Sequence, residues 1–178
     1  MMTTAHAFMG MSLDGFIARQ DHSLDWLMKF DTTDEDHGFD AFMDSVDGLV
    51  MGANTFKTVL GFDSWPYTKK VVVMTRSLSP QDIPAELQDK VRLSSQSPEE
   101  LMQQLRDEDW SRAYVDGGQL VQSFIRSGLL ADITLTILPT LIGSGVRLFG
   151  ALDADQDLEL MNSQSFGSGF VTNCYKFL

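Results

Sequence analysis

The chain has 178 residues, of which 43% are hydrophobic and 21% are charged. This length suits one domain with a full hydrophobic core, which we expect to span residues 1–178. Thirteen Lys and Arg residues stand against 25 Asp and Glu residues, a formal charge of −12 that repels the phosphates of nucleic acids and acidic membranes. We expect neither as a partner. The absence of a long apolar run and of a signal-peptide pattern indicates a cytoplasmic protein.

The first half of the chain alternates apolar runs with helical patterns. Residues 5–11 predict a buried first strand, and Asp14-Gly15 predicts the turn at which the chain leaves the sheet. Residues 19–35 are mostly polar and predict a long loop, of the kind that binds ligands, anchored by Trp26. The further elements expected up to residue 107 are a helix over 35–46, a strand at 49–51, a helix beginning near 54, strands at 69–74 and 91–93, and a helix over 98–107.

The stretch 113–128 is the centre of the functional prediction. A short apolar run ends at Asp116-Gly117-Gly118, and apolar residues then recur with the spacing of one helical face until Gly128. A strand that runs through paired glycines into a helix brings backbone N–H groups and the positive end of the helix dipole to one point, which favours a phosphate. The same residues also fit a simple tight turn.

Two further strand ends resemble that stretch. Gly52-Ala53-Asn54-Thr55 again follows a strand and opens a helix, with Asn54 or Thr55 able to cap its first turn. Thr75-Arg76 places a hydroxyl and a cation after another strand, as a sugar phosphate requires. Three such ends predict a phosphorylated cofactor.

After residue 130 the pattern contains only strands, at 132–138 and 170–178, around the loop 143–149. The sequence therefore predicts an α/β fold of three layers, with a mostly parallel central sheet, flanking helices and an antiparallel C-terminal edge. Cys174 lies in the last strand and is interpreted as a small buried hydrophobe. The surplus of apolar residues at this end predicts a homodimer through the C-terminal strands or the loop 143–149.

A series of short motifs along nearly the whole chain resembles the dihydrofolate reductase superfamily, and more closely its branch with the reductase domain of riboflavin biosynthesis. The motifs are Ser12-Leu13-Asp14-Gly15-Phe16-Ile17-Ala18, Asp25-Trp26-Leu27, Asp34-Glu35-Asp36-His37-Gly38, Met51-Gly52, Asp116-Gly117-Gly118, Leu138-Pro139, Gly143-Ser144-Gly145 and Leu148-Phe149. The resemblance implies the cofactor NADPH. The implied contacts are Gly10, Ile17 and Ala18 along the nicotinamide, Gly52, Ala53, Asn54, Thr55, Gly117, Gly118, Gln119 and Leu120 at the phosphates, and Thr75 and Arg76 at the adenosine 2′-phosphate.

The chain departs from this family at the second site. Members usually carry Arg after the glycine and Tyr after the Thr, whereas this chain has Ala53 and Phe56. A lost guanidinium–phosphate contact corresponds to about 1.5–3 kcal/mol, or roughly tenfold to a hundredfold in affinity. Lys57 is the nearby cation that could replace it in part.

Hydride transfer needs a proton source, and the candidates are Asp14 and Asp36. Asp14 also fits a turn, and the acids at 34–36 also fit helix capping. In dihydrofolate reductases the substrate-binding carboxylate comes from the equivalent helix, so one of these three acids is expected to face the pocket. The expected substrate contacts are Trp26 as a stacking wall or core anchor, Glu35 and Phe39. His37 has no second His or Cys at metal-site spacing, so we expect no metal.

Three functions stay open. The first is an NADPH-dependent reductase that transfers a hydride to a pterin-like or pyrimidine-like heterocycle, at a CH–NH or carbonyl-type group. The second is reduction of 5-amino-6-(5-phosphoribosylamino)uracil in riboflavin synthesis. The third is NADPH binding without turnover, which the absence of an arginine at position 53 favours.

Overall fold

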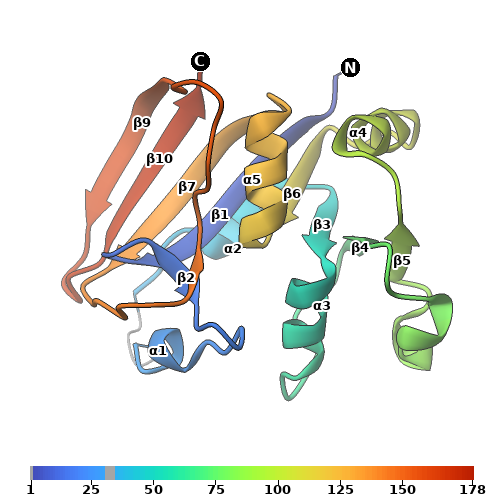
Figure 1. The fold of residues 1–178 in the computed structure, drawn as a ribbon, viewed down its shortest axis with the longest axis horizontal. Helices are drawn as coiled ribbons and strands as arrows, with labels where there is room; N and C mark the ends of the chain where they lie inside the picture. Colours follow the sequence, from blue (N-terminus) through green and yellow to red (C-terminus); the bar gives the residue numbers. More distant parts are fainter. Residues whose placement is uncertain (1, 31–34) are drawn as a thin grey trace.

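A computed structural model describes residues 2–30 and 35–178. Its main element is an eight-stranded sheet in the order β5-β4-β3-β6-β1-β7-β10-β9 (Figure 1). Neighbours from β5 to β7 are parallel, whereas β10 and β9 join antiparallel, which confirms the predicted sheet and its C-terminal edge. The strands are β1 Thr4–Ser12, β3 Gly48–Gly52, β4 Lys70–Met74, β5 Val91–Ser94, β6 Arg112–Asp116, β7 Leu130–Leu138, β9 Leu158–Ser165 and β10 Val171–Phe177.

Side chains alternate between two apolar cores, one on each face of the sheet. Val50, Val72 and Val115 face the core that contains α4 and α5, whereas Leu49 and Val71 face the core on the side of α2 and α3. Figure 1 shows α5 in front of the sheet and α2 behind it, so the fold has three layers. The helices are α2 Phe39–Ser45, α3 Ala53–Leu60, α4 Pro98–Asp107 and α5 Gly118–Arg126, with short 3-10 turns at Pro80–Asp82 and Ala85–Leu87.

A second, two-stranded sheet pairs β2 Phe16–Ala18 with β8 Val146–Arg147. Asp14 ties the same two segments together, because its carboxylate accepts hydrogen bonds from the Ser12 hydroxyl at 2.6 Å and from the Gly143 N–H at 2.8 Å. These contacts fix the turn before β2, where Gly15 has a φ of +91°. The early turn predicted at Asp14-Gly15 is confirmed.

The segment predicted as a loop over 19–35 contains a short helix, α1 Asp25–Met28. Its Trp26 is 1% exposed and packs with Leu138 and Phe170, so the predicted anchor is confirmed. Helix α2 begins at Phe39, four residues later than predicted, after Gly38 in the left-handed conformation. At its other end, the Lys69 ammonium donates to the main-chain oxygens of Met43, Asp44 and Val46.

Strand β9 is absent from the prediction. All eight of its residues are exposed, so its sequence shows no alternation between buried and exposed positions.

Cys174 on β10 is half-buried rather than fully buried. Across residues 2–30 and 35–178, none of the helices has the length and apolar character needed to cross a membrane.

Candidate functional site

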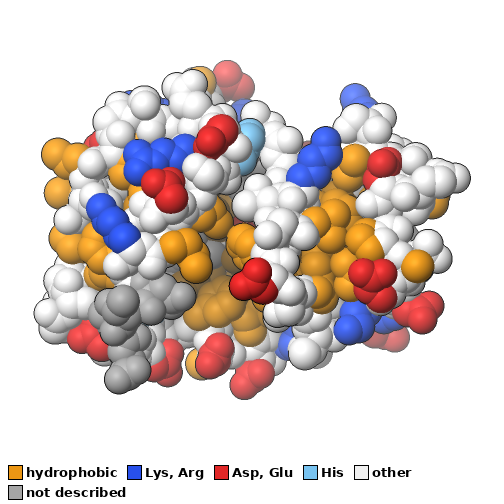
Figure 2. Space-filling view, turned by 90° about the horizontal axis from the view of Figure 1, so that it is seen from below, with side chains coloured by type: hydrophobic (Ala, Val, Ile, Leu, Met, Phe, Trp, Pro, Cys, Tyr) orange, Lys and Arg blue, Asp and Glu red, His pale blue; other side chains and the backbone are white. Residues whose placement is uncertain are grey.

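A cleft of about 1110 Å³ opens where the parallel strands end. Figure 2 looks at this end of the molecule and shows a hollow in which hydrophobic side chains are visible. Parallel α/β sheets bind ligands at the carboxyl ends of their strands. The cleft is slightly larger than the roughly 300–1,000 Å³ of ordinary ligand pockets, so it has room for a dinucleotide and a second small molecule.

Two helix N-termini line the cleft, those of α3 and α5. Their N-cap residues are Gly52 and Gly117, and neither helix has a side-chain cap, so the expected capping by Asn54 or Thr55 is wrong. Gly117 has a φ of +100°, and a Cβ there would lie 2.4 Å from the Thr55 Oγ1. A Cβ on Gly52 would meet no protein atom within 4 Å, which leaves open space at the start of α3. The backbone therefore fits an anion at both helix ends.

Arg76 stands where β4 ends and lines the same cleft. Its position is held by a turn in which the Thr75 hydroxyl accepts the N–H groups of Ser77 at 3.1 Å and Leu78 at 3.2 Å. Arg76 is exposed, so its guanidinium is free to meet a ligand phosphate. Arg126 is the second cation among the described residues that line the cleft.

Aromatic and aliphatic side chains line the other end of the cleft. The ring centroids of Phe8 and Phe39 are 5.4 Å apart, and those of Phe39 and Tyr114 are 6.4 Å apart. We call this region the aromatic end, and it lies across β1 and β7. It consists of Phe8, Leu24, Leu27, His37, Phe39, Tyr114, Leu138 and Phe170.

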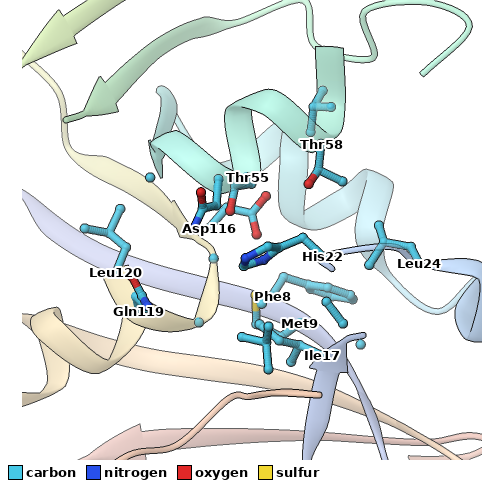
Figure 3. Close-up of a pocket in the computed structure, with 18 of the residues that line it drawn as sticks. Phe8, Met9, Ile17, His22, Leu24, Thr55, Thr58, Asp116, Gln119 and Leu120 are labelled. Carbon is cyan, nitrogen blue, oxygen red and sulfur yellow. The ribbon is translucent and has the colours of Figure 1, made fainter. Parts of the chain in front are cut away.

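A carboxyl group that the sequence analysis did not select faces the cleft. Asp116 ends β6, and Figure 3 shows it among the residues around the cavity. Removal from water raises the pKa of this carboxyl to about 6. Hydrogen bonds from the Gly117 N–H and from the Tyr114 and Tyr67 hydroxyls act in the opposite direction and lower this pKa, but the effect of burial is larger.

His22 projects into the cavity from the loop before α1 (Figure 3). It is a non-glycine residue with a φ of +66°, a conformation that costs about 1–2 kcal/mol. A tight turn holds it, because the His22 N–H donates to the Arg19 carbonyl oxygen at 3.0 Å. The Arg19 guanidinium in turn pairs with both Asp25 carboxylate oxygens, at 2.9 and 3.1 Å. No signal in the sequence indicated this strained residue.

The acids proposed as catalytic residues do not line the cleft, and this corrects the prediction. The Asp14 carboxylate is committed to the turn before β2, and Asp36 accepts the Gly38 N–H at 2.7 Å. Glu35 accepts the Ser168 N–H at 3.2 Å, and hydrogen bonds from the side chain and the backbone of Ser168 lower the pKa of Glu35. Trp26 lies in the core rather than on a cleft wall. Asp34 lies outside the described residues.

The other predicted site residues come together in the cleft. Phe39 lies at its aromatic end, whereas Lys57 does not line it and so does not replace the arginine missing at position 53. Within residues 2–30 and 35–178, no three His, Cys, Asp or Glu side chains are grouped as a metal site would need. The residues expected at the cofactor that line the cleft are Gly10, Ile17, Ala18, Gly52, Ala53, Asn54, Thr55, Thr75, Arg76, Gly117, Gly118, Gln119 and Leu120.

The sheet order, the antiparallel C-terminal edge and the cleft across the strand ends define a protein with the dihydrofolate-reductase-like fold. Residues 4–172 match the RibD C-terminal domain, and the chain belongs to that family. It is 30% identical over 164 residues to the uncharacterized protein YwjB of Bacillus subtilis (strain 168), covering 90% of each chain. It is 24% identical over 181 residues to the uncharacterized protein YyaP of the same organism, covering 94% of this chain and 91% of that protein.

Solved structures agree with this assignment. The crystal structure of a "putative riboflavin biosynthesis protein" from Shewanella sp. PV-4 superposes with a TM-score of 0.92 at 34% identity over 99% of each chain. A diaminohydroxyphosphoribosylaminopyrimidine deaminase/5-amino-6-(5-phosphoribosylamino)uracil reductase from Thermotoga maritima gives a TM-score of 0.78 at 13% identity. The match covers 99% of this chain and 57% of that one, and it shows the shared fold.

Proposed function

We propose that this protein is an NADPH-dependent reductase that transfers a hydride to a flat heterocycle of the pterin or pyrimidine kind. The observation that supports the proposal is that the two ends of the cleft differ in chemical character. At one end are two helix N-termini without side-chain caps and the exposed Arg76, which suit the phosphates of a dinucleotide. At the other end are aromatic walls, which suit a ring. Membership of the RibD C-terminal domain family supports a reductase.

Each group has a role in this proposal. The backbone at 52–55 and 117–120 holds the cofactor phosphates, and Thr75 and Arg76 hold the 2′-phosphate that distinguishes NADPH from NADH. When bound, the nicotinamide supplies the hydride. Asp116, whose pKa is raised to about 6, supplies the proton. When the carbon of a C=N or C=O group accepts that hydride, its π bond would open, the electron pair would move to the nitrogen or oxygen and take the Asp116 proton, and water would return a proton to the carboxylate.

Two alternatives have specific support. The name of the Thermotoga maritima relative supports the phosphoribosylamino-uracil as substrate. Ala53, which lines the cleft where relatives usually carry arginine, supports weak or non-productive NADPH binding. Turnover separates these functions, because the passive binder oxidises no NADPH with any substrate of a pterin and pyrimidine panel.

The test is a fluorescence titration of NADPH and NADH against the wild type and Arg76→Ala. The loss of a charged hydrogen bond to the 2′-phosphate, about 1.5–3 kcal/mol, should weaken NADPH roughly tenfold to a hundredfold and leave NADH nearly unchanged. Arg147→Ala is the matched control, since that guanidinium is exposed, lies 4.6 Å over the Phe16 ring and does not line the cleft. Equal loss of both cofactors in Arg76→Ala would remove Arg76 from this role.

A further inference from the structure

We infer that the substrate of this protein is a flat ring that carries neither a phosphate nor a carboxylate group. The inference rests on the proposed function, in which the cofactor occupies the end of the cleft that holds Arg76 and the N-termini of α3 and α5. It deepens that proposal, because it separates two substrate classes that a RibD-like cleft could accept. The evidence is the distribution of charge along the cleft.

The aromatic end holds no Lys or Arg among the described residues. The two that line the cleft are Arg76, after β4, and Arg126, in the last turn of α5. Residues 31–34 are Asp-Thr-Thr-Asp, so this segment contains no Lys or Arg. Two basic side chains close in sequence to Leu24 and Leu27 already have partners, since Arg19 pairs with Asp25 and Lys29 donates to the Thr140 hydroxyl at 3.2 Å.

A phosphate at the aromatic end would also meet unfavourable charge. Asp116 stands between the two ends of the cleft without a Lys or Arg partner in the described chain. The chain as a whole carries a formal charge of −12, so the general field offers no compensation. Anion sites in proteins need local donors such as an arginine fork or a helix N-terminus. Both arginines lie at the other end, and the two short helices that begin at the aromatic end, α1 and α2, carry Asp25 and Asp40 in their first turns, which oppose an anion there.

The groups that are present suit an uncharged ring. Phe8 and Phe39 supply aromatic faces for stacking. His22 brings an imidazole into the cavity, and Asp116 brings a carboxyl (Figure 3). Together they offer a donor and an acceptor to the edge of a heterocycle with N–H and C=O groups. An imidazole bonds such an edge well in its neutral form but lacks the fixed charge and fork of an arginine.

The experiment uses riboflavin and flavin mononucleotide as probes, because they share one flat ring system and differ by a phosphate. Quenching of flavin fluorescence is titrated at pH 8 with saturating NADP⁺, so that the helix N-termini are occupied. We expect riboflavin to bind at least tenfold more tightly than flavin mononucleotide. Equal or tighter binding of flavin mononucleotide, or failure of riboflavin to bind, overturns the inference.

Two variants sharpen the result. Phe39→Arg places a cation at the aromatic end and should cancel or reverse the preference for riboflavin. Leu141→Arg adds the same charge at a side chain that is 70% exposed and lies outside the cleft, so its preference should equal that of the wild type. An unchanged preference in Phe39→Arg would also overturn the inference. A titration of NADPH on the same samples keeps the proposals distinct, because absent NADPH binding with an intact flavin preference refutes only the cofactor assignment.

Discussion

Replacing Asp116 by Asn should stabilise the protein at alkaline pH and impair its reaction. In the folded protein the pKa of this carboxyl is about 6, against an ordinary value of 3.8. A raised pKa means that the folded state binds the proton more tightly than the unfolded state does. Stability is therefore lost as pH rises from about 4 to about 6, and at about 1.4 kcal/mol per pH unit the total is about 3 kcal/mol. Asn removes the charge at nearly constant volume, so it should recover about 1–3 kcal/mol.

The assay is urea unfolding of the wild type and Asp116→Asn at pH 4 and pH 8. The stabilising effect should appear at pH 8 and nearly vanish at pH 4, where the wild-type carboxyl is protonated. Asp36→Asn is the control, because that carboxylate lies outside the cleft and accepts a loop N–H. Wild-type NADPH oxidation should fall as pH rises above about 6, and Asp116→Asn should be slow at every pH. Equal stabilisation at both pH values, or a wild-type activity profile in the variant, would refute the reasoning.

Three further predictions concern the backbone, the sheet edge and helix α2. Gly117→Val should abolish NADPH binding in a folded protein, because φ is +100° and a Cβ there lies 2.4 Å from Thr55; normal titration with a native circular dichroism spectrum would contradict this. We propose a homodimer through the free edge at β9, where Leu160 and Met161 are 54% and 57% exposed; a light-scattering mass near 19.9 kDa would contradict it. Lys69→Met should cost about 1–3 kcal/mol in urea unfolding, since three main-chain oxygens near the end of α2 lose their charged donor; an unchanged midpoint would show that water replaces it.

Most of the fold could be predicted from local sequence patterns. The buried parallel strands read as continuous apolar runs, such as Val71 to Val73, and the capping box of Ser97 and Glu100 marked the start of α4. Strand β9 could not be found this way, because its eight exposed residues give no period. Its strand conformation depends on pairing with β10, which the sequence of β9 does not reveal.

The candidate site also contains parts that local sequence patterns predict and parts that they do not. The glycine-based ends were predictable because a strand, a glycine and a helix follow one another within a few residues. The role of each carboxylate could not be predicted, because it depends on partners that are distant in sequence. The Asp14 carboxylate accepts a hydrogen bond from the Gly143 N–H, and the Glu35 carboxylate accepts one from the Ser168 N–H. Both bonds join residues far apart in sequence, so they form only in the folded chain. Burial raises the pKa of Asp116 despite the hydrogen bonds from Tyr114 and Tyr67 that lower it, and this burial depends on the folded structure rather than on the residues next to Asp116 in sequence.

The pairing of β1 sets the order in which the chain can fold during synthesis. The first strand has β6 and β7 as its two neighbours, and these begin at Arg112 and Leu130. A nascent chain therefore carries an apolar strand without a partner until more than a hundred further residues have left the ribosome, while β3, β4 and β5 can already pair with one another. Such long-range closure is entropically slow. The strand near the centre of the finished sheet is thus made before both of its neighbours, and it stays without either of them until β6 and β7 have followed.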